Sequence, residues 1–370
     1  MATTAVSLRS YKSNFSGIPG YIAGLPSYPR NFSRDTFLAG ILAMDKDLLR
    51  TQIILAANHQ GTGYDAATGE EAGKVHHEYP GVKLAGRGDY VTTYNACDTT
   101  ALFLLAIEAL GQLDECSYAE IIAGYQRNIV LAVSYILRHV KTNIFYEYPP
   151  DDADHFALKV TYWKDSIAPD PLASELCYPV AYALAHFQAA RGLLSAARIL
   201  RTPGLLEAAD VMFKTGIRKF LRPAQFVVAT GHRFQLAQPS SDELHSLAYI
   251  PQKYGHLLPL EAIEQRSKGL FTSVGLACTP ESIATLLDDP YHGYVVWPFE
   301  QAFIHYGSAK FNLPSCADLA KRIVPFIAQG NELIGVKPKI EPRGNSHQLW
   351  SVAAGIYFDG YSSLRDNPWL

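Results

Sequence analysis

The sequence has no long apolar run and no large excess of charge of either sign. None of its apolar stretches approaches the roughly 18 residues needed to cross a membrane, and residues 1–13 lack the continuous apolar core of a secretory signal. The formal net charge is −3, which does not suggest the basic surface of a nucleic-acid-binding protein. We therefore expect neither a membrane nor a nucleic acid as a partner.

Cysteines are few, and their spacing suggests no pairing. The chain has five, an odd number, and none lies in a Cys-x-x-Cys pair. Free thiols in a reducing compartment are the simplest interpretation, which predicts a cytoplasmic protein. The adjacent residues His76, His77 and Glu78 lack the spacing that places metal ligands on one helix face. We expect neither a metal nor another cofactor.

Strand patterns are rare, and internal repeats are absent. β-rich segments are confined to residues 142–149, 157–163 and 225–230. Elsewhere helical periodicity predicts helices that begin near residues 33, 50, 98, 117, 171, 203, 241, 259, 280, 297, 315 and 345. The helix near residue 171 is expected to run to about residue 200 with a kink at Pro179. Such a series without a solenoid period predicts six helical hairpins closed in a ring, an all-α (α/α)6 barrel that forms a single domain over residues 1–370.

Polar and aromatic residues cluster at five places, mostly where a predicted helix begins. Adjacent arginine and aspartate at a helix start can offer donors and acceptors to vicinal hydroxyls, although an aspartate there also simply stabilises the helix N-terminus. Aromatic rings suit the stacking of sugar rings and equally suit a large core. The candidate site residues are Arg34, Asp35, His77, Glu78, Tyr94, Asp98, Trp163, Lys164, Asp165, Trp297, Glu300, Glu341, Gln348 and Trp350.

Three carboxyl groups in these clusters are candidates for acid–base chemistry. Asp165 follows Tyr162 and Trp163 closely, and an apolar wall is expected to raise its pKa, as a general acid requires. A surface ion pair with the preceding lysine fits the same residues. Glu300 lies in the first turn of a predicted helix, and Glu341 lies in a loop rich in glycine, proline and asparagine. Each of these glutamates could be a base or an ordinary structural residue.

Taken together, the clusters resemble segments of the amylo-α-1,6-glucosidase domain of glycogen debranching enzymes and their bacterial relatives. Residues 24–26 and 34–36 are similar to the family's Gly-Leu-Pro and Arg-Asp-Thr, and residues 73–78 are similar to Gly-Lys-x-x-His-Glu. Residues 94–103 resemble a Tyr-x-x-x-Asp segment, residues 163–165 resemble Trp-[Lys/Met]-Asp, and residues 348–351 resemble Gln-Ala-Trp-Ser. The motifs occur in the family's order and cover about residues 24–355.

This resemblance implies an (α/α)6 toroid that releases one sugar from a non-reducing end with inversion. It makes Asp165 the general acid and Glu341 the general base, while Arg34 and Asp35 grip the terminal sugar. Residues 344–347 stand where the family has a cysteine-containing stretch, so Glu300 remains the alternative base. The remaining residues of the five clusters are expected to bind the saccharide substrate.

The resemblance leaves the substrate and two other classes of function open. The chain begins almost at the first motif, so we expect no β-rich domain before it, and a small glucoside fits as well as a polymer. A helical-toroid epimerase or lyase would instead use a histidine or tyrosine as base, for which His77, His245 and His292 are candidates. A third possibility is an inactive relative that binds saccharide without turnover.

Overall fold

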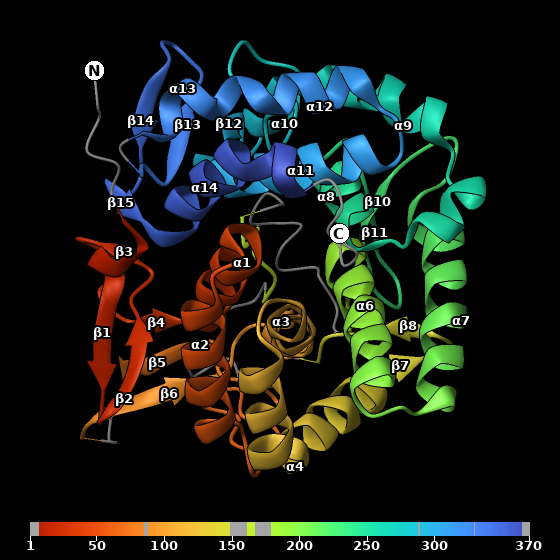
Figure 1. Ribbon diagram of the computed structural model, residues 1–370. Helices are drawn as coiled ribbons and strands as arrows, with labels where there is room; N and C mark the ends of the chain where they lie inside the picture. Colours follow the sequence, from red (N-terminus) through yellow and green to blue (C-terminus); the bar gives the residue numbers. More distant parts are fainter. Residues whose placement is uncertain are drawn as a thin grey trace.

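Six helices form a closed inner ring in the computed structural model, which describes residues 7–84, 88–148, 161–166, 179–287, 289–328 and 330–364. Each inner helix packs against the next in chain order, and the last packs against the first (Figure 1). The predicted (α/α)6 fold is therefore confirmed. The inner helices are α1 (Ser33–Ala43), α3 (Thr99–Leu113), α6 (Ala183–Ile199), α8 (Asp242–Tyr249), α11 (Pro298–Lys310) and α14 (Leu349–Leu364).

A second layer of helices covers the ring from outside (Figure 1). Its longer members are α2 (Lys46–Asn58), α4 (Glu115–His139), α7 (Pro203–Phe220), α9 (Leu260–Ser267) and α12 (Pro314–Ala320). Short helices link these layers: η1 (Leu8–Tyr11), η2 (Gln252–Leu257), η3 (Lys268–Leu270), α10 (Glu281–Ala284), η4 (Pro290–His292), η5 (Lys321–Ile323) and α13 (Val324–Ile327). Within the described ranges, no helix is both long enough and apolar enough to cross a membrane.

The two layers differ in the way their apolar residues are distributed. Sixteen of the seventeen residues of α6 are buried, which is expected of a helix that contacts protein on all sides. The outer helix α7 instead buries one stripe, whose members are three or four residues apart, from Ala209 to Phe220. The two helices approach closely at Gly216, where a Cβ atom would overlap the ring of His186.

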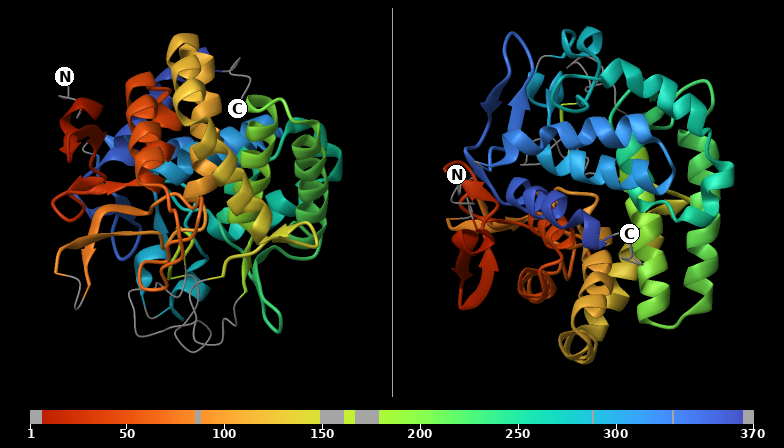
Figure 2. Two further views of the ribbon diagram at one scale, coloured as in Figure 1. Left: turned by 90° about the horizontal axis from the view of Figure 1, so that it is seen from below. Right: turned by 45° about the horizontal axis from the view of Figure 1, so that its top comes forward.

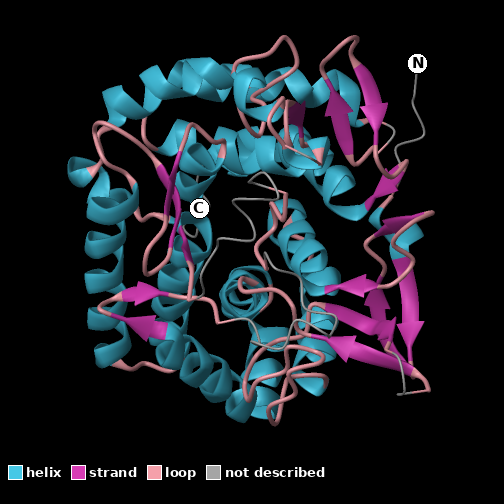
Figure 3. Ribbon diagram, turned by 180° about the vertical axis from the view of Figure 1, so that it is seen from behind, coloured by secondary structure: helices cyan, strands magenta, loops and turns pink. Residues whose placement is uncertain are grey.

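Strands occur only as short pieces around the helices, and Figure 3 shows no central sheet among the described residues. They pair as β1 (Lys12–Phe15) with β2 (Ile18–Tyr21), β3 (Gly24–Leu25) with β15 (His347–Gln348), and β7 (Val140–Lys141) with β8 (Ile144–Phe145). Three-stranded sheets join β4 (Asn31–Phe32), β5 (Glu78–Lys83) and β6 (Tyr90–Thr93); β9 (Ala181–Tyr182), β10 (Val227–Thr230) and β11 (Gln235–Ala237); and β12 (Val295–Val296), β13 (Leu333–Gly335) and β14 (Glu341–Arg343).

Strands directly precede four of the six inner helices. The strands β4, β9, β12 and β15 each end within one residue of an inner helix, α1, α6, α11 and α14 respectively. The hairpins β5–β6 and β10–β11 lie toward one end of the ring, as the left view of Figure 2 shows. The strand pairs thereby hold the N-terminal turns of these inner helices in fixed positions. The side chains that these turns carry are held in place with them.

Some predicted boundaries are wrong. The helix expected from residue 171 to about residue 200 begins only at Ala183, because Ala181 and Tyr182 pair with β10 as a strand; residues 171–178 lie outside the described ranges. Residues 161–163 form no strand, and residues 157–160 are not described. Asp98 precedes α3 as expected, but its side chain makes no capping hydrogen bond.

Candidate functional site

A small pocket lies where the inner helices begin, with a cavity volume of about 110 Å³. Its walls come from the first turns of α1 and α14, the residue before α11, the segment 161–166 and η4. Backbone N–H groups at helix N-termini favour anionic groups, which suits a site rich in carboxylates. The lining residues are Tyr28, Phe32, Arg34, Asp35, His77, Trp163, Asp165, Tyr291, His292, Trp297, Glu332, Gln348 and Trp350.

Asp165 is the most exposed of the three carboxyl groups that line this pocket, the others being Asp35 and Glu332. Its side chain is 46% exposed, and its Oδ1 lies 3.2 Å from Nδ1 of the buried His292. Burial raises the pKa of Asp165, but the hydrogen bond and charge of His292, together with the charge of Arg34, more than offset it, so the net shift is downward. The raised pKa expected from the sequence is therefore wrong, because the combined effect of His292 and Arg34 exceeds that of burial.

Glu332 is another of these carboxyl groups, and it is not among the site residues predicted from the sequence. It is 2% exposed, accepts a hydrogen bond from the Tyr291 hydroxyl, and accepts another from the Asn345 backbone N–H at 2.6 Å. Burial raises its pKa. Gly344, with φ of +71°, passes so close that a Cβ atom would overlap the Glu332 carboxylate. The sequence signal that could have identified Glu332 is a single acidic residue between Asn331 and an apolar run.

Asp35 is linked to this loop by two amides. Gln348 Nε2 donates to Asp35 Oδ1 at 3.0 Å, and Asn345 Nδ2 donates to Gln348 Oε1 at 3.0 Å. The Ser27 backbone N–H donates to Asn345 Oδ1, which fixes the orientation of both amides. Burial, with a contribution from Glu332, raises the pKa of Asp35 to about 7. Asp35 can therefore exchange a proton near neutral pH.

Arg34 lines the pocket and is held there by a buried ion pair. Its Nε lies 2.7 Å from Asp98 Oδ2, and its Nη2 donates to the Thr161 carbonyl at 2.9 Å. Asp98 therefore positions Arg34, and Arg34 in turn holds the segment that carries Asp165.

Three further predicted residues line the pocket without strong partners. Burial holds the pKa of His77 well below its usual value, so this imidazole is neutral. The indole N–H groups of Trp297 and Trp350 are buried and have no hydrogen-bond partner among the described residues. Both indole rings line the pocket, although their N–H groups are themselves inaccessible to solvent.

Other predicted residues lie outside the pocket. Glu78 is paired with Arg30 at 2.6 Å, and the Tyr94 hydroxyl donates to the His59 carbonyl. Neither residue contributes to the pocket wall.

Glu341, the predicted base, is also outside the pocket. It lies on β14, one strand beyond β13, with a side chain 33% exposed. Its carboxylate is paired with Lys339 at 3.0 Å and with Arg343 at 3.2 Å, and the hydrogen bond from Lys339 lowers its pKa. The structure does not bring Glu341 together with Asp165, because the adjacent strand carries the chain away from the pocket.

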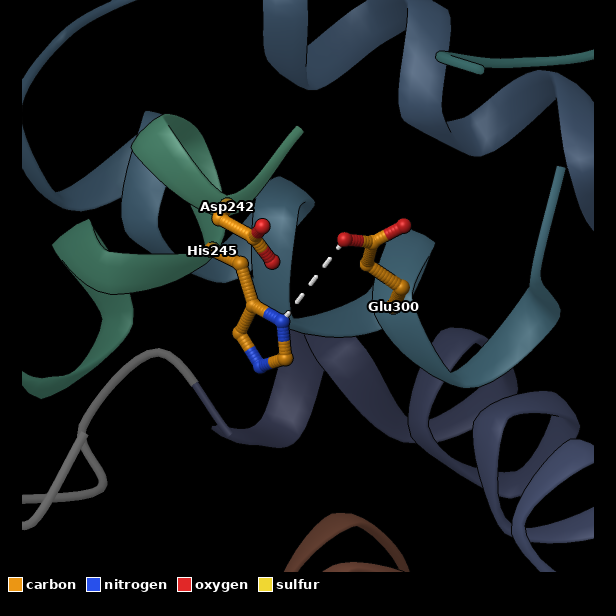
Figure 4. Close-up of side chains that lie close together, drawn as sticks. All are labelled: Asp242, His245 and Glu300. Carbon is orange, nitrogen blue, oxygen red and sulfur yellow. Dashed lines mark ion pairs between the residues drawn. The ribbon is translucent and has the colours of Figure 1, made fainter. Parts of the chain in front are cut away.

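Glu300, the alternative base, belongs to a buried cluster beneath the pocket. Figure 4 shows Asp242 and His245 on α8 facing Glu300 on α11. Their donor atoms lie within 4.8 Å of one another, a grouping that could hold a metal ion. However, the buried Lys164 ammonium already lies 3.2 Å from both Asp242 and Glu300. Lys164 thus supplies the positive charge that these acids require.

Comparisons with known proteins support the fold assignment. No protein-family model and no curated protein matches the sequence. The structure is similar to a GH63 mannosylglycerate hydrolase from Thermus thermophilus in complex with Tris and D-glycerate (TM-score 0.65, 11% identity, 94% of this chain and 97% of that chain). It is similar to the same enzyme in complex with glucose (TM-score 0.64, 12% identity, 95% and 98%). At these identities the likeness shows that the chain has the six-hairpin (α/α)6 fold of that hydrolase.

Proposed function

We propose that the protein is a glycoside hydrolase in which Asp165 and Glu332 form the acid–base pair. The observation that carries this proposal is that Asp165 and Glu332, from distant parts of the chain, line one small pocket together with Asp35 and three tryptophans. Hydrolysis of a glycosidic bond needs one group to protonate the leaving oxygen and another to activate water. Glu332 thus replaces Glu341 and Glu300 as our proposed base.

The exposure of the two groups supports Asp165 as the acid. In a blind pocket the released sugar lies innermost, and the leaving group points toward solvent. Asp165 is 46% exposed, so it is suited to protonate the outward-pointing oxygen. Glu332 is 2% exposed and is suited to activate a water molecule beside the enclosed sugar.

The pKa directions favour a second assignment with the roles exchanged. Burial raises the pKa of Glu332, whereas His292 lowers the pKa of Asp165. A general acid normally has the raised pKa of a pair. A bound glycoside would displace water and change the contacts of Asp165, so we retain Asp165 as the acid and test the order directly.

For the substrate, we propose a small α-glycoside of glucose or mannose, cleaved with inversion. The cavity of about 110 Å³ is far below the roughly 300–1,000 Å³ of pockets for larger ligands, so it suits one sugar residue rather than a polymer segment. The structural neighbour is a mannosylglycerate hydrolase, and one of its complexes contains glucose. Arg34, Asp35 and Gln348 would orient the sugar hydroxyls.

The first experiment follows released sugar by proton NMR with α-glucosides, α-mannosides and short α-glucans. Release of the β-anomer supports an inverting hydrolase. No release from any substrate, with ligand-induced shifts still present, would favour a sugar-binding protein. Loss of activity on replacing His77 or His292, but not Asp165, would favour an epimerase or lyase.

Three variants then test the assignment of the pair. We expect Asp165→Asn to lose about 10²–10⁴-fold of kcat/KM on an alkyl glycoside while keeping most activity on the glycosyl fluoride, whose leaving group needs no proton. Glu332→Gln should lose both activities. Glu341→Gln is the matched control, a paired acid one strand away, and should keep kcat/KM within about twofold. If Asp165→Asn instead loses both activities while Glu332→Gln keeps activity on the fluoride, Glu332 is the acid and Asp165 is the base.

A further inference from the structure

Three consecutive side chains in front of Asp165 bind one buried carboxylate. The Tyr162 hydroxyl donates to Asp242 Oδ2 at 2.5 Å, and the Trp163 indole N–H donates to Asp242 Oδ1 at 3.2 Å. The Lys164 ammonium lies 3.2 Å from the same Oδ1. Asp242 is 1% exposed and begins the inner helix α8. A carboxylate with two oxygens is the side chain best able to accept from so many donors at once.

The same segment is held from the next inner helix. Lys164 lies 3.2 Å from Glu300 on α11 and donates to Ser241 at 2.5 Å. Ser241 in turn donates to Glu300 at 2.6 Å. Burial alone would raise the pKa of Glu300, but the ammonium lowers it, so this acid remains charged. Two members of the cluster in Figure 4, Asp242 and Glu300, therefore bind the Lys164 ammonium through their carboxylates.

Both ends of the segment are also attached to the ring. The Thr161 carbonyl accepts from Arg34 of α1 and from the Cys97 backbone N–H. At the other end, His292 is bonded to Asp165 and to Ser166. Asp165, which is not itself on a helix or strand, therefore takes its position from these contacts.

We propose that Asp242 is the positioning residue of the general acid, acting through Tyr162, Trp163 and Lys164, with Glu300 in support. This inference rests on the proposed function, because it assigns Asp165 the acid's role. Because the buried Asp242 carboxylate binds the side chains of the three residues that precede Asp165, it allows little displacement of Asp165. An error of about 1 Å in a reacting group can cost about 10²-fold in rate.

The test compares Asp242→Asn with Glu243→Gln. Both changes replace a buried carboxylate in the first turn of α8 with an amide. Glu243, however, is paired with Arg266 rather than with the segment that carries Asp165. The substrates are α-D-glucosyl fluoride and methyl α-D-glucoside, or the two mannosyl equivalents if mannose is the sugar released by the unaltered enzyme.

A positioning role predicts a loss that depends on the leaving group. Asp242→Asn should lower kcat on the methyl glycoside by about tenfold to 10²-fold, with KM and the fluoride activity changed less than about threefold. Glu243→Gln should leave the ratio of the two activities unchanged. Equal losses on both substrates by Asp242→Asn would mean a structural role and would overturn the proposal.

A milder variant keeps the inference testable if Asp242→Asn does not fold. Tyr162→Phe removes one donor to Asp242 and leaves the ion pair with Lys164 intact. We expect a severalfold loss on the methyl glycoside and none on the fluoride; an unchanged ratio contradicts the proposal. If the unaltered enzyme hydrolyses neither substrate, the failure belongs to the proposed function and not to the role of Asp242.

Discussion

At the scale of single residues, the pocket contains acidic side chains whose burial disfavours their charged form. Asp35 is a buried acid with a pKa of about 7, and Glu332 is a buried acid packed against Gly344, where a Cβ atom would overlap its carboxylate. Such positions are expected where activity and stability conflict. Substitutions at or beside these two residues lead to predictions in which the effect on activity differs from the effect on stability.

Asp35→Asn should stabilise the folded protein while removing activity. Because the folded pKa of Asp35 is raised to about 7, the folded state keeps a proton that the unfolded chain releases above about pH 4. Stability from this group is therefore lost as the pH rises toward 7. Denaturant titration should show a gain of at most roughly 4 kcal/mol at pH 8 and almost none at pH 4. A gain independent of pH would contradict the assignment.

Gly344→Ala should impair the proposed base. Its Cβ atom would overlap the Glu332 carboxylate, and φ of +71° is unfavourable for alanine. We expect kcat/KM to fall about 10²-fold. Gly17→Ala is the matched control, since Gly17 has φ of +89° and nothing within 4 Å of its Cβ position; it should lose only stability. Similar kinetics for the two variants would show that Gly344 has no link to the base.

At the scale of elements, the sequence predicts five of the six inner helices to within about four residues of their starts, whereas the predicted start near residue 171 precedes that of α6 by twelve residues. Apolar periodicity carries this prediction, since α1, α3, α6, α8 and α11 have no side-chain capping hydrogen bond. Asp35 could be identified because it lies in the first turn of α1, and Asp165 because it follows Tyr162 and Trp163 in a segment that resembles a family motif. Glu332 could not, because its place in the pocket depends on the pairing of Val296 with Ile334 across β12 and β13. The same pairing explains why Glu341, on the neighbouring strand, faces other partners.

Gly216→Ala should destabilise the contact between α6 and α7. The added methyl group would overlap the His186 ring, and overpacking a core typically costs about 1–3 kcal/mol. Gly204→Ala, on the same helix with nothing within 4 Å, should be neutral or stabilising by less than about 1 kcal/mol. Urea unfolding measures both free energies, and equal values for the two variants would argue against close packing at Gly216.

At the scale of the whole molecule, buried neutral histidines set the response to acid. Burial lowers the pKa of His76 to about 3, lowers those of His186 and His305 to about 4, and holds that of His77 well below its usual value. These groups take up protons near pH 6.5 only when the chain unfolds. Asp35 acts in the opposite direction, as do Glu78, Glu243 and Glu332, whose pKa values burial also raises, but only Asp35 among them is raised as far as about 7. Stability should therefore rise with pH between about 5 and 6.5.

His186 shows the cause most clearly and provides the test. Its Nδ1 accepts from the Phe145 backbone N–H at 3.2 Å, and its Nε2 lies 3.0 Å from the Met212 carbonyl. This pair of partners requires the neutral ring, since a proton on Nδ1 would face another N–H group. His186→Gln keeps a donor and an acceptor but cannot titrate, so it should lower the slope of unfolding free energy against pH by up to about 1.4 kcal/mol per unit. His256→Gln, at an exposed position, should leave the slope unchanged. If the slope for His186→Gln equals that of the unaltered protein, the sensitivity of stability to acid does not arise from His186 between α6 and α7.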